Sequence, residues 1–310
     1  MSDTRHPALP YVAFTALSLI WGGSFLFIKL GIQDMSPTVL VLVRSASGAI
    51  ALASIMAGMR RSLFSDDWRQ RLIPLAIMAV INAVLPWALI AWGEQHITSG
   101  LASILNSTTA LWTAILIFWV IPTERPSLLN YIGVLMGIAG VGILVLPDLL
   151  THGVSGSVLG VIAVVLAAVS YAVAALFQRT KLRGMNIYHQ SFGQLAATSV
   201  IALPLALPAL PSVHLAWLSM GAVVFLGVGG SGIAYVLYYY TMNTLGPVRA
   251  TGVTFVVPLT AVFWGVALLG ESLTVPIVAG MVVILAGVVL TNVRRTPRRV
   301  PALERDSAAA

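Results

Sequence analysis

The feature that most constrains this chain is a succession of ten apolar stretches, each of roughly 20 residues, separated by short polar breaks. A helix rises about 1.5 Å per residue, so about 20 residues cross the roughly 30 Å hydrocarbon layer of a bilayer. Hydrophobic residues make up 58% of the 310 and charged residues 9%, at a mean hydropathy of +0.95, which is unlike a soluble domain. The predicted spans are 11–31, 37–58, 71–92, 98–121, 128–147, 156–177, 188–208, 214–240, 247–269 and 274–293.

The predicted fold class is therefore an all-α integral membrane protein with ten transmembrane helices. A β-barrel is excluded because its strands alternate lipid-facing and lumen-facing residues, whereas these stretches are continuously apolar. The longest polar breaks, 59–70 and 178–187, leave no room for a soluble catalytic or nucleic-acid-binding domain. The chain contains no cysteine, which excludes disulfides, thiol catalysis and iron–sulfur ligation.

The positions of the basic residues predict the topology. Nearly all of the 17 Lys and Arg residues lie in the termini or in breaks that fall on one side of a ten-span chain. The breaks on the other side, 92–97, 148–155, 209–213 and 270–273, contain none. By the positive-inside rule both termini are cytoplasmic, and the net charge of +7 reflects topology rather than a nucleic-acid partner.

The second half of the chain repeats features of the first at an offset of 147 residues. Glu124 corresponds to Glu271, and the glycines and small residues that follow keep the same spacing. The predicted domains are one five-helix repeat at 1–150, a second at 151–293, and a basic cytoplasmic tail at 294–310. Because each repeat holds an odd number of spans, the two are inverted, an architecture common among secondary transporters.

Several short motifs occur in a fixed order along the chain: Trp21-Gly22, Arg44, the segment 98–103, Glu124, Pro258 and the segment 269–273. On these motifs the chain resembles the EamA family of the drug/metabolite transporter superfamily over roughly residues 11–293. The resemblance implies spans one, three, four, six, eight and nine around a central cavity, and transport of small metabolites by alternating access. A proline that the family often has in span four is replaced by Leu111, so the two halves should flex unequally.

Polar residues inside a membrane are costly and point to either a cavity or helix–helix contacts. Ser103 and Asn106 belong to a polar stripe along span four, with spacings of three and four residues. In span three, Pro86 frees a backbone carbonyl at Asn82, which could bind a zwitterion or merely accompany a kink. Trp87 follows directly and is a candidate for the same cavity.

Aromatic residues near the middle of three spans are candidates for an apolar wall with polar tips. Trp21 lies in span one and Tyr171 in span six, while Tyr235, Tyr238 and Tyr239 follow a glycine-rich run in span eight. Packing within the bundle is the alternative role for each of them. Pro258 in span nine is, with Pro86, a predicted hinge or kink.

Among the ionisable residues, Arg44 lies deepest, about two turns into span two. It either pairs with a helix-end carbonyl or a carboxylate, which we favour, or contacts an anionic group of the substrate. No Asp or Glu lies within a span, and Glu94 stands only at a mouth. Exchange of protons for cationic drugs generally uses a buried carboxylate, so a multidrug cation/proton antiporter is disfavoured.

An intramembrane serine protease is the competing class, because Gly229–Gly232 match a GxSG pattern around Ser231. The serine would need a histidine base on a later helix, and no histidine follows it in the sequence. An enzyme is therefore not expected. Metal-ligand spacing and a phosphate-binding loop are also absent from the sequence.

The sequence thus predicts a multi-pass transporter of the inner (plasma) membrane with no cofactor. Its partners are the lipid bilayer and a small substrate that is zwitterionic or neutral and amphipathic. Amino acids, including aromatic ones as in YddG-type exporters, are the preferred substrates. A sugar-phosphate-type carrier would want several convergent cations, and Arg44 is the single deep one. A monomer and a homodimer are both compatible with the sequence.

Overall fold

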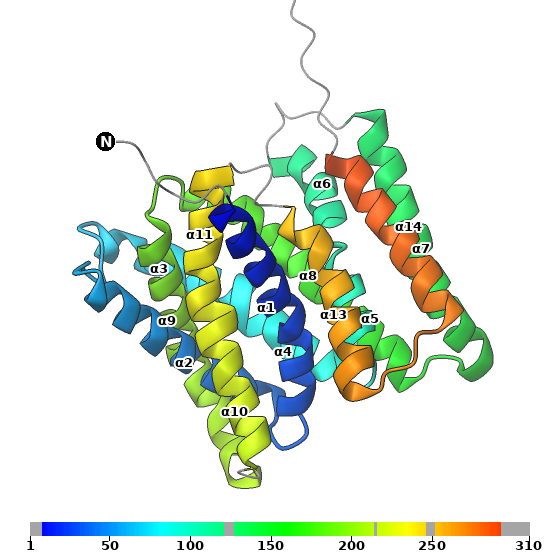
Figure 1. The fold of residues 1–310 in the computed structure, drawn as a ribbon, viewed down its shortest axis with the longest axis horizontal. Coiled ribbons are helices and arrows are strands. Elements are labelled where there is room, and N and C mark those ends of the chain that lie inside the picture. Colours follow the sequence, from blue (N-terminus) through cyan, green and yellow to red (C-terminus); the bar gives the residue numbers. More distant parts are fainter. Residues whose placement is uncertain (1–7, 121–126, 214–215, 246–251, 293–310) are drawn as a thin grey trace, which may run out of the picture.

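Helices form every regular element in the described residues of a computed structural model, which are 8–120, 127–213, 216–245 and 252–292 (Figure 1). The basic C-terminal tail lies outside them. The helices that cross in one unbroken piece are α1 (Leu9–Gly31), α2 (Pro37–Gly58), α7 (Leu128–His152), α8 (Gly156–Lys181), α9 (Ile187–Ala206), α13 (Val253–Leu269) and α14 (Val275–Asn292).

The other three spans change geometry partway. The third consists of α3 (Trp68–Ala79), the π-helical η1 (Val80–Val84) and α4 (Leu85–Gly93). The fourth consists of α5 (Ser99–Asn106) and α6 (Thr109–Val120). The eighth consists of α10 (Trp217–Phe225), the π-helical η3 (Leu226–Ile233) and α11 (Ala234–Leu245), and a short 3₁₀ turn, η2 (Leu207–Ser212), precedes it.

The ten predicted spans match this arrangement to within a few residues at most ends. Eight helical segments are long and apolar enough to cross a membrane, and two shorter apolar helices, α13 and α14, complete the set. Many large apolar side chains on the outer faces are exposed, for example Ile50 and Leu135 at 68% and 66%. This is the surface that a lipid environment requires.

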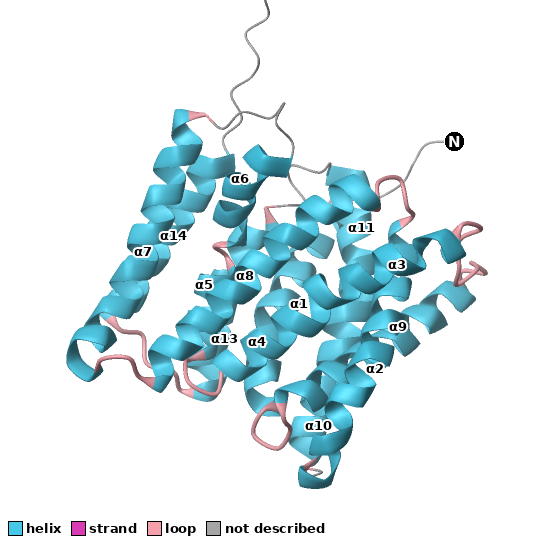
Figure 2. Ribbon diagram, turned by 180° about the vertical axis from the view of Figure 1, so that it is seen from behind, coloured by secondary structure: helices cyan, strands magenta, loops and turns pink. Residues whose placement is uncertain are grey.

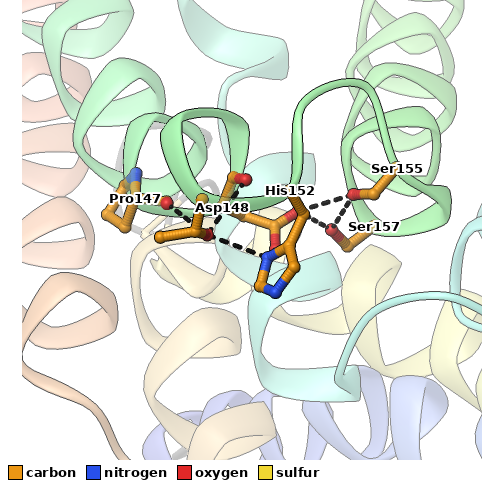
Figure 3. A network of polar contacts seen from close by, with 6 residues as sticks. Pro147, Asp148, His152, Ser155 and Ser157 are labelled. Carbon is orange, nitrogen blue, oxygen red and sulfur yellow. Dashed lines mark hydrogen bonds and ion pairs between the residues drawn. The ribbon is translucent and has the colours of Figure 1, made fainter.

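Helices α1, α4, α7 and α13 end at the same end of the bundle (Figure 1). Their last turns, or the turns that follow them, carry Asp34, Glu94, Asp148 and Glu271, and we call this end the acidic end. The opposite, basic end includes the last turns of α2 and α8. Figure 3 shows the acidic-end turn that joins the fifth and sixth spans, where Asp148 accepts hydrogen bonds from His152 (3.0 Å), Ser155 (2.7 Å) and Ser157. These bonds fix the direction in which α8 re-enters the bundle.

Helices α7 and α14 pair closely at one edge of the bundle (Figure 2). A Cβ on Gly287 would lie 2.5 Å from the carbonyl oxygen of Gly133, and one on Gly280 would lie 3.1 Å from that of Gly140. The four glycines are related by the 147-residue offset, since 133 + 147 = 280 and 140 + 147 = 287. Gly133 therefore faces Gly287, the repeat counterpart of Gly140, and Gly140 faces Gly280, the repeat counterpart of Gly133.

The two π-helical segments obey the same offset. Adding 147 to residues 80–84 gives 227–231, which lie inside η3. The hydropathy pattern did not predict these segments, nor the break at Ser107 and Thr108 between α5 and α6. At the break, the Ser107 hydroxyl donates to the carbonyl oxygen of Ile104 and the Thr108 hydroxyl donates to that of Leu105. These side-chain bonds take the place of regular main-chain helical hydrogen bonds there.

Candidate functional site: a cavity open at the basic end

A cavity of about 1000 Å³ lies between the helices. Its walls come from the first four spans, from the sixth, eighth and ninth, and at its rim from the ends of α7 and α14. Of the residues proposed from sequence, those lining it are Trp21, Arg44, Asn82, Trp87, Ser103, Asn106, Tyr171, Tyr235, Tyr238 and Pro258. Pro86 is buried within α4 and is not among the lining residues, and the Tyr239 side chain lies outside what the structure describes.

Arg44 is buried at 8% exposure and still lines the cavity. Its Nε donates to Ser231 Oγ at 3.2 Å, and its guanidinium carbon lies 3.8 Å from the ring centroid of Trp87. The partners of Arg44 in the described structure are thus not the carboxylate or helix-end carbonyl that the sequence interpretation favoured. A hydroxyl and an aromatic face hold the guanidinium instead, and neither neutralises its charge.

No Asp or Glu is among the described residues that line the cavity. Its charged residues are Arg44 in the depth and Arg179, exposed, at the basic end. A lining with positive charge and no negative charge favours solutes that carry an anionic group.

Aromatic side chains form one wall. The Trp21 indole donates to the carbonyl oxygen of Gly230 at 3.2 Å, and its ring centroid lies 5.5 Å from that of Tyr238. Tyr171 and Tyr235 lie near the Arg44 guanidinium. The cavity therefore combines a cation with extended apolar faces that carry hydroxyl groups at their edges.

Asn106 and Ser103, both in α5, also line the cavity, and neither Asn106 Oδ1 nor Ser103 Oγ has a hydrogen-bond partner in the described part of the chain. Asn82 is different, because its amide donates to Gln194 at 3.2 Å. The carbonyl that accepts an outside hydrogen bond near Pro86 is that of Ile81, from Ser170 at 2.6 Å. The Asn82 amide, which the sequence placed beside a freed carbonyl, is thus engaged with Gln194.

The cavity reaches the surface at the basic end, where its rim includes Ser127, Asn130, Arg179 and Thr291. The acidic end is closed by hydrogen bonds. The Glu271 carboxylate accepts from the backbone amides of Ser99 at 2.6 Å and Gly100 at 3.1 Å, at the N-terminus of α5. This contact joins segments from opposite halves of the chain.

A second contact at the acidic end involves Lys29 of α1. Its Nζ donates to the carbonyl oxygens of Glu94 and, at 2.9 Å, Ile97. A third joins Ser219 of α10 to Asp34. These contacts have no local sequence pattern, because each joins residues that are at least 65 positions apart.

Ser231, the candidate protease nucleophile, is engaged with Arg44. The histidines in the described segments are bonded elsewhere: His96 to Trp92, His152 to Asp148 and His189 to Ser62. His6 and His214 lie outside those segments. A serine whose oxygen accepts from an arginine lacks the base that would activate it.

A helical bundle of membrane-spanning length around a central cavity, closed at one end, defines a membrane transporter. The model of the EamA-like transporter family matches this chain twice, over residues 9–146 and 158–293, and the chain belongs to that family. It is a multi-pass membrane protein that acts on a small-molecule substrate in a lipid bilayer.

Relatives with curated descriptions cover almost the same length. The uncharacterized transporter YoaV of Bacillus subtilis is 23% identical over 92% of this chain and 97% of its own. The uncharacterized inner membrane transporter YedA of Escherichia coli K12 is 28% identical over 84% of this chain and 83% of its own. One chain of known crystal structure superposes with a TM-score of 0.65 at 19% identity, covering 93% of this chain and 97% of that one, which supports the fold.

Proposed function

We propose that this transporter exports amino acids, aromatic ones included, by alternating access. The observation that carries the proposal is Arg44, an arginine deep in a cavity whose described lining has no carboxylate. An α-carboxylate is a natural ligand for a guanidinium with donors free to face the cavity. Arg44 donates through Nε to Ser231, so its terminal nitrogens remain for the substrate.

The other end of a zwitterion also finds partners. Asn106 Oδ1 and Ser103 Oγ are oxygen acceptors that receive no hydrogen bond within the described residues, and an ammonium group has three donors and no acceptor. The rings of Trp21 and Tyr238 line the same cavity and lie 5.5 Å apart between centroids. An aromatic side chain would pack there, because offset or tilted ring pairs add to the burial of apolar surface.

Alternating access is supported by the internal repeat. The family model matches each half separately, the paired glycines of α7 and α14 obey the 147-residue offset, and so do the two π-helical segments. Two inverted halves of similar structure can exchange conformations, so that the cavity opens at the acidic end when it closes at the basic end.

The orientation that the basic residues favour supports export. The positive-inside rule places the open, basic end in the cytoplasm of a cell with this protein in its inner membrane. The structure then corresponds to the state that loads substrate from the cytoplasm. Glu271 and Lys29 keep the outer end closed until loading is complete.

The other transporter classes fit the cavity less well. A multidrug carrier for cations would place its substrate beside Arg44 with no compensating carboxylate. A sugar-phosphate carrier would bind a dianion with the single deep arginine, whereas phosphate sites generally combine several cationic or amide donors.

The test is counterflow in proteoliposomes loaded with phenylalanine, using three labelled solutes of similar shape. Phenylalanine carries both charges, phenethylamine lacks the carboxylate and 3-phenylpropionate lacks the ammonium. We expect phenylalanine to exchange fastest. Faster exchange of phenethylamine would refute the role of Arg44, and faster exchange of 3-phenylpropionate would show an organic-anion carrier.

Matched variants locate the effect. Arg44→Gln removes the deep charge and should weaken phenylalanine binding by about 10-fold to 100-fold, the value of a charged hydrogen bond of roughly 1.5–3 kcal/mol. Arg183→Gln removes an exposed charge at the basic end and should leave binding unchanged. Equal phenylalanine affinity of the Arg44→Gln and Arg183→Gln variants would contradict the proposed site.

A further inference from the structure

Glu94 is the most unusual ionisable residue outside the cavity. It follows α4 at the acidic end and its exposure is 0%. Neither carboxylate oxygen has a hydrogen-bond partner in the described structure. The sequence placed Glu94 at an open mouth, so its complete burial corrects that expectation.

The charged groups around Glu94 are engaged with other partners. Lys29 of α1 donates to main-chain carbonyl oxygens, including that of Glu94 itself, rather than to the carboxylate. Glu271, after α13, is held by the amides that begin α5. Arg44 of α2 binds Ser231. These three are the charges that act on Glu94, and Glu271 is repulsive.

A carboxylate without water or a donor cannot keep its charge at an acceptable cost, and it takes up a proton instead. Burial raises the pKa of the Glu94 carboxyl well above its usual value, with the attraction of Lys29 opposing the shift, Glu271 adding to it and Arg44 opposing it. The closed acidic end therefore favours the neutral form of Glu94.

Opening of the acidic end would expose Glu94 and favour its charged form. The Glu271 contact with Ser99 and Gly100 and the Lys29 contacts with the loop must break before α1 and α13 can separate from the 94–100 segment. Water then reaches Glu94, and the released Lys29 becomes a partner for its anion. The two states of this end consequently differ by one bound proton.

We propose that Glu94 is a proton-binding site that fills when the acidic end closes and empties when it opens. This inference rests on the proposed alternating-access function but not on the identity of the substrate. Glu94 is not among the residues that line the cavity, so its proton returns to the side from which it came. Proton binding therefore biases the gate without driving net transport.

The direction of the pH effect follows from linkage. The closed state binds the additional proton, so its population relative to the open state rises as the pH falls. The ratio of closed to open states changes by up to tenfold per pH unit between an ordinary carboxyl pKa of about 4.3 and the raised value of the closed state. Above the raised value the ratio is constant.

The experiment uses the natural absence of cysteine. Gln95 and Thr274 are exposed and stand on the two sides of the Glu271 contact. Spin labels attached at Gln95→Cys and Thr274→Cys, with the protein in lipid nanodiscs, report the distance between these two loops by pulsed electron paramagnetic resonance. In the protein with native Glu94, we expect a short and a long distance, with the short population growing as the pH is lowered.

Three further variants in the labelled background sharpen the test. Glu94→Gln, a neutral side chain of the same size, should give the short distance at every pH. Glu94→Asp retains a titrating group and should retain a pH dependence, and Asp66→Asn removes an exposed carboxylate at the basic end and should behave as the native chain.

A distance distribution of the native-Glu94 protein that does not change with pH would overturn the proposal without reference to any mutant. So would an unaltered pH response in Glu94→Gln, or a response to Na⁺ concentration at fixed pH, which would make the carboxylate a metal-cation site. If the distances respond to pH while no amino acid exchanges in counterflow, the proton-binding proposal is supported and the proposed amino-acid substrate is refuted.

Discussion

Gly227 is the residue at which α2 approaches η3 most closely, and replacing it tests the geometry that places Arg44. A Cβ at this position would lie 1.9 Å from Ser47 Oγ and 2.4 Å from the main-chain carbonyl oxygen of Arg44. The serine hydroxyl can rotate away, but the carbonyl belongs to the helix backbone. Gly227→Ala therefore requires the two segments to move apart.

The size of the movement can be worked from the distances. A carbon atom and a carbonyl oxygen approach to about 3.3 Å, so relief of the contact requires a shift of roughly 1 Å. Overpacking of this kind costs about 1–3 kcal/mol and should lower Tm by about 2–10 °C. The same shift would lengthen the 3.2 Å bond between Arg44 and Ser231 beyond hydrogen-bond range.

The matched control is Gly221→Ala in α10, six residues earlier in the same span, where an added Cβ meets nothing within 4 Å. Alanine favours a helix over glycine by up to about 1 kcal/mol, so this variant should be as stable as the native chain or more so. Thermal unfolding in detergent and phenylalanine affinity are measured for both. Equal stability of the two variants would refute the close approach as described.

The remaining predictions concern topology, chemistry and coupling. An impermeant thiol reagent applied to intact cells should label Ser155→Cys and not Ser65→Cys, and the reverse pattern would invert the proposed orientation. Ser231→Ala should fold and retain most of its transport, because the serine only supports Arg44; loss of a proteolytic activity in this variant would revive the enzyme hypothesis. Asn106→Leu should lower the affinity for a zwitterion by about one to two orders of magnitude at normal expression. Tyr235→Ala should weaken the binding of bulky substrates more than that of small ones. Native flux in both variants would show that these residues serve only helix packing. Downhill flux should persist when a protonophore abolishes the pH gradient, since no carboxylate lines the described cavity, and strict proton stoichiometry would contradict this.

Much of the fold follows from the sequence, because each transmembrane helix must satisfy its own backbone within an apolar segment. Hydropathy alone places the spans, and helix periodicity brings Ser103 and Asn106 to the same face. Mid-span aromatic residues such as Trp21 and Tyr171 proved to line the cavity for a related reason: a polar tip inside a membrane needs a partner or a cavity.

What the sequence did not yield depends on contacts between distant segments. The Glu271 carboxylate caps α5 from 172 residues away, and that contact has no local pattern. Glu94 looks like any loop residue until Lys29 and the surrounding helices cover it. Arg44 could not be assigned because the choice among partners was decided by Trp87 and Ser231, which lie on other helices.

The π-helical segment η1 has a consequence for how the third span can vary. Such a segment is an α-helix with one residue too many, and one residue corresponds to about 100° of rotation. Deleting a single residue from Val80–Val84 would restore regular helical bonding, yet it would turn α3 by that angle relative to α4. Length change in this span is therefore not neutral: a shortened helix would present a different set of side chains to α9 while the cavity wall around Trp87 kept its place.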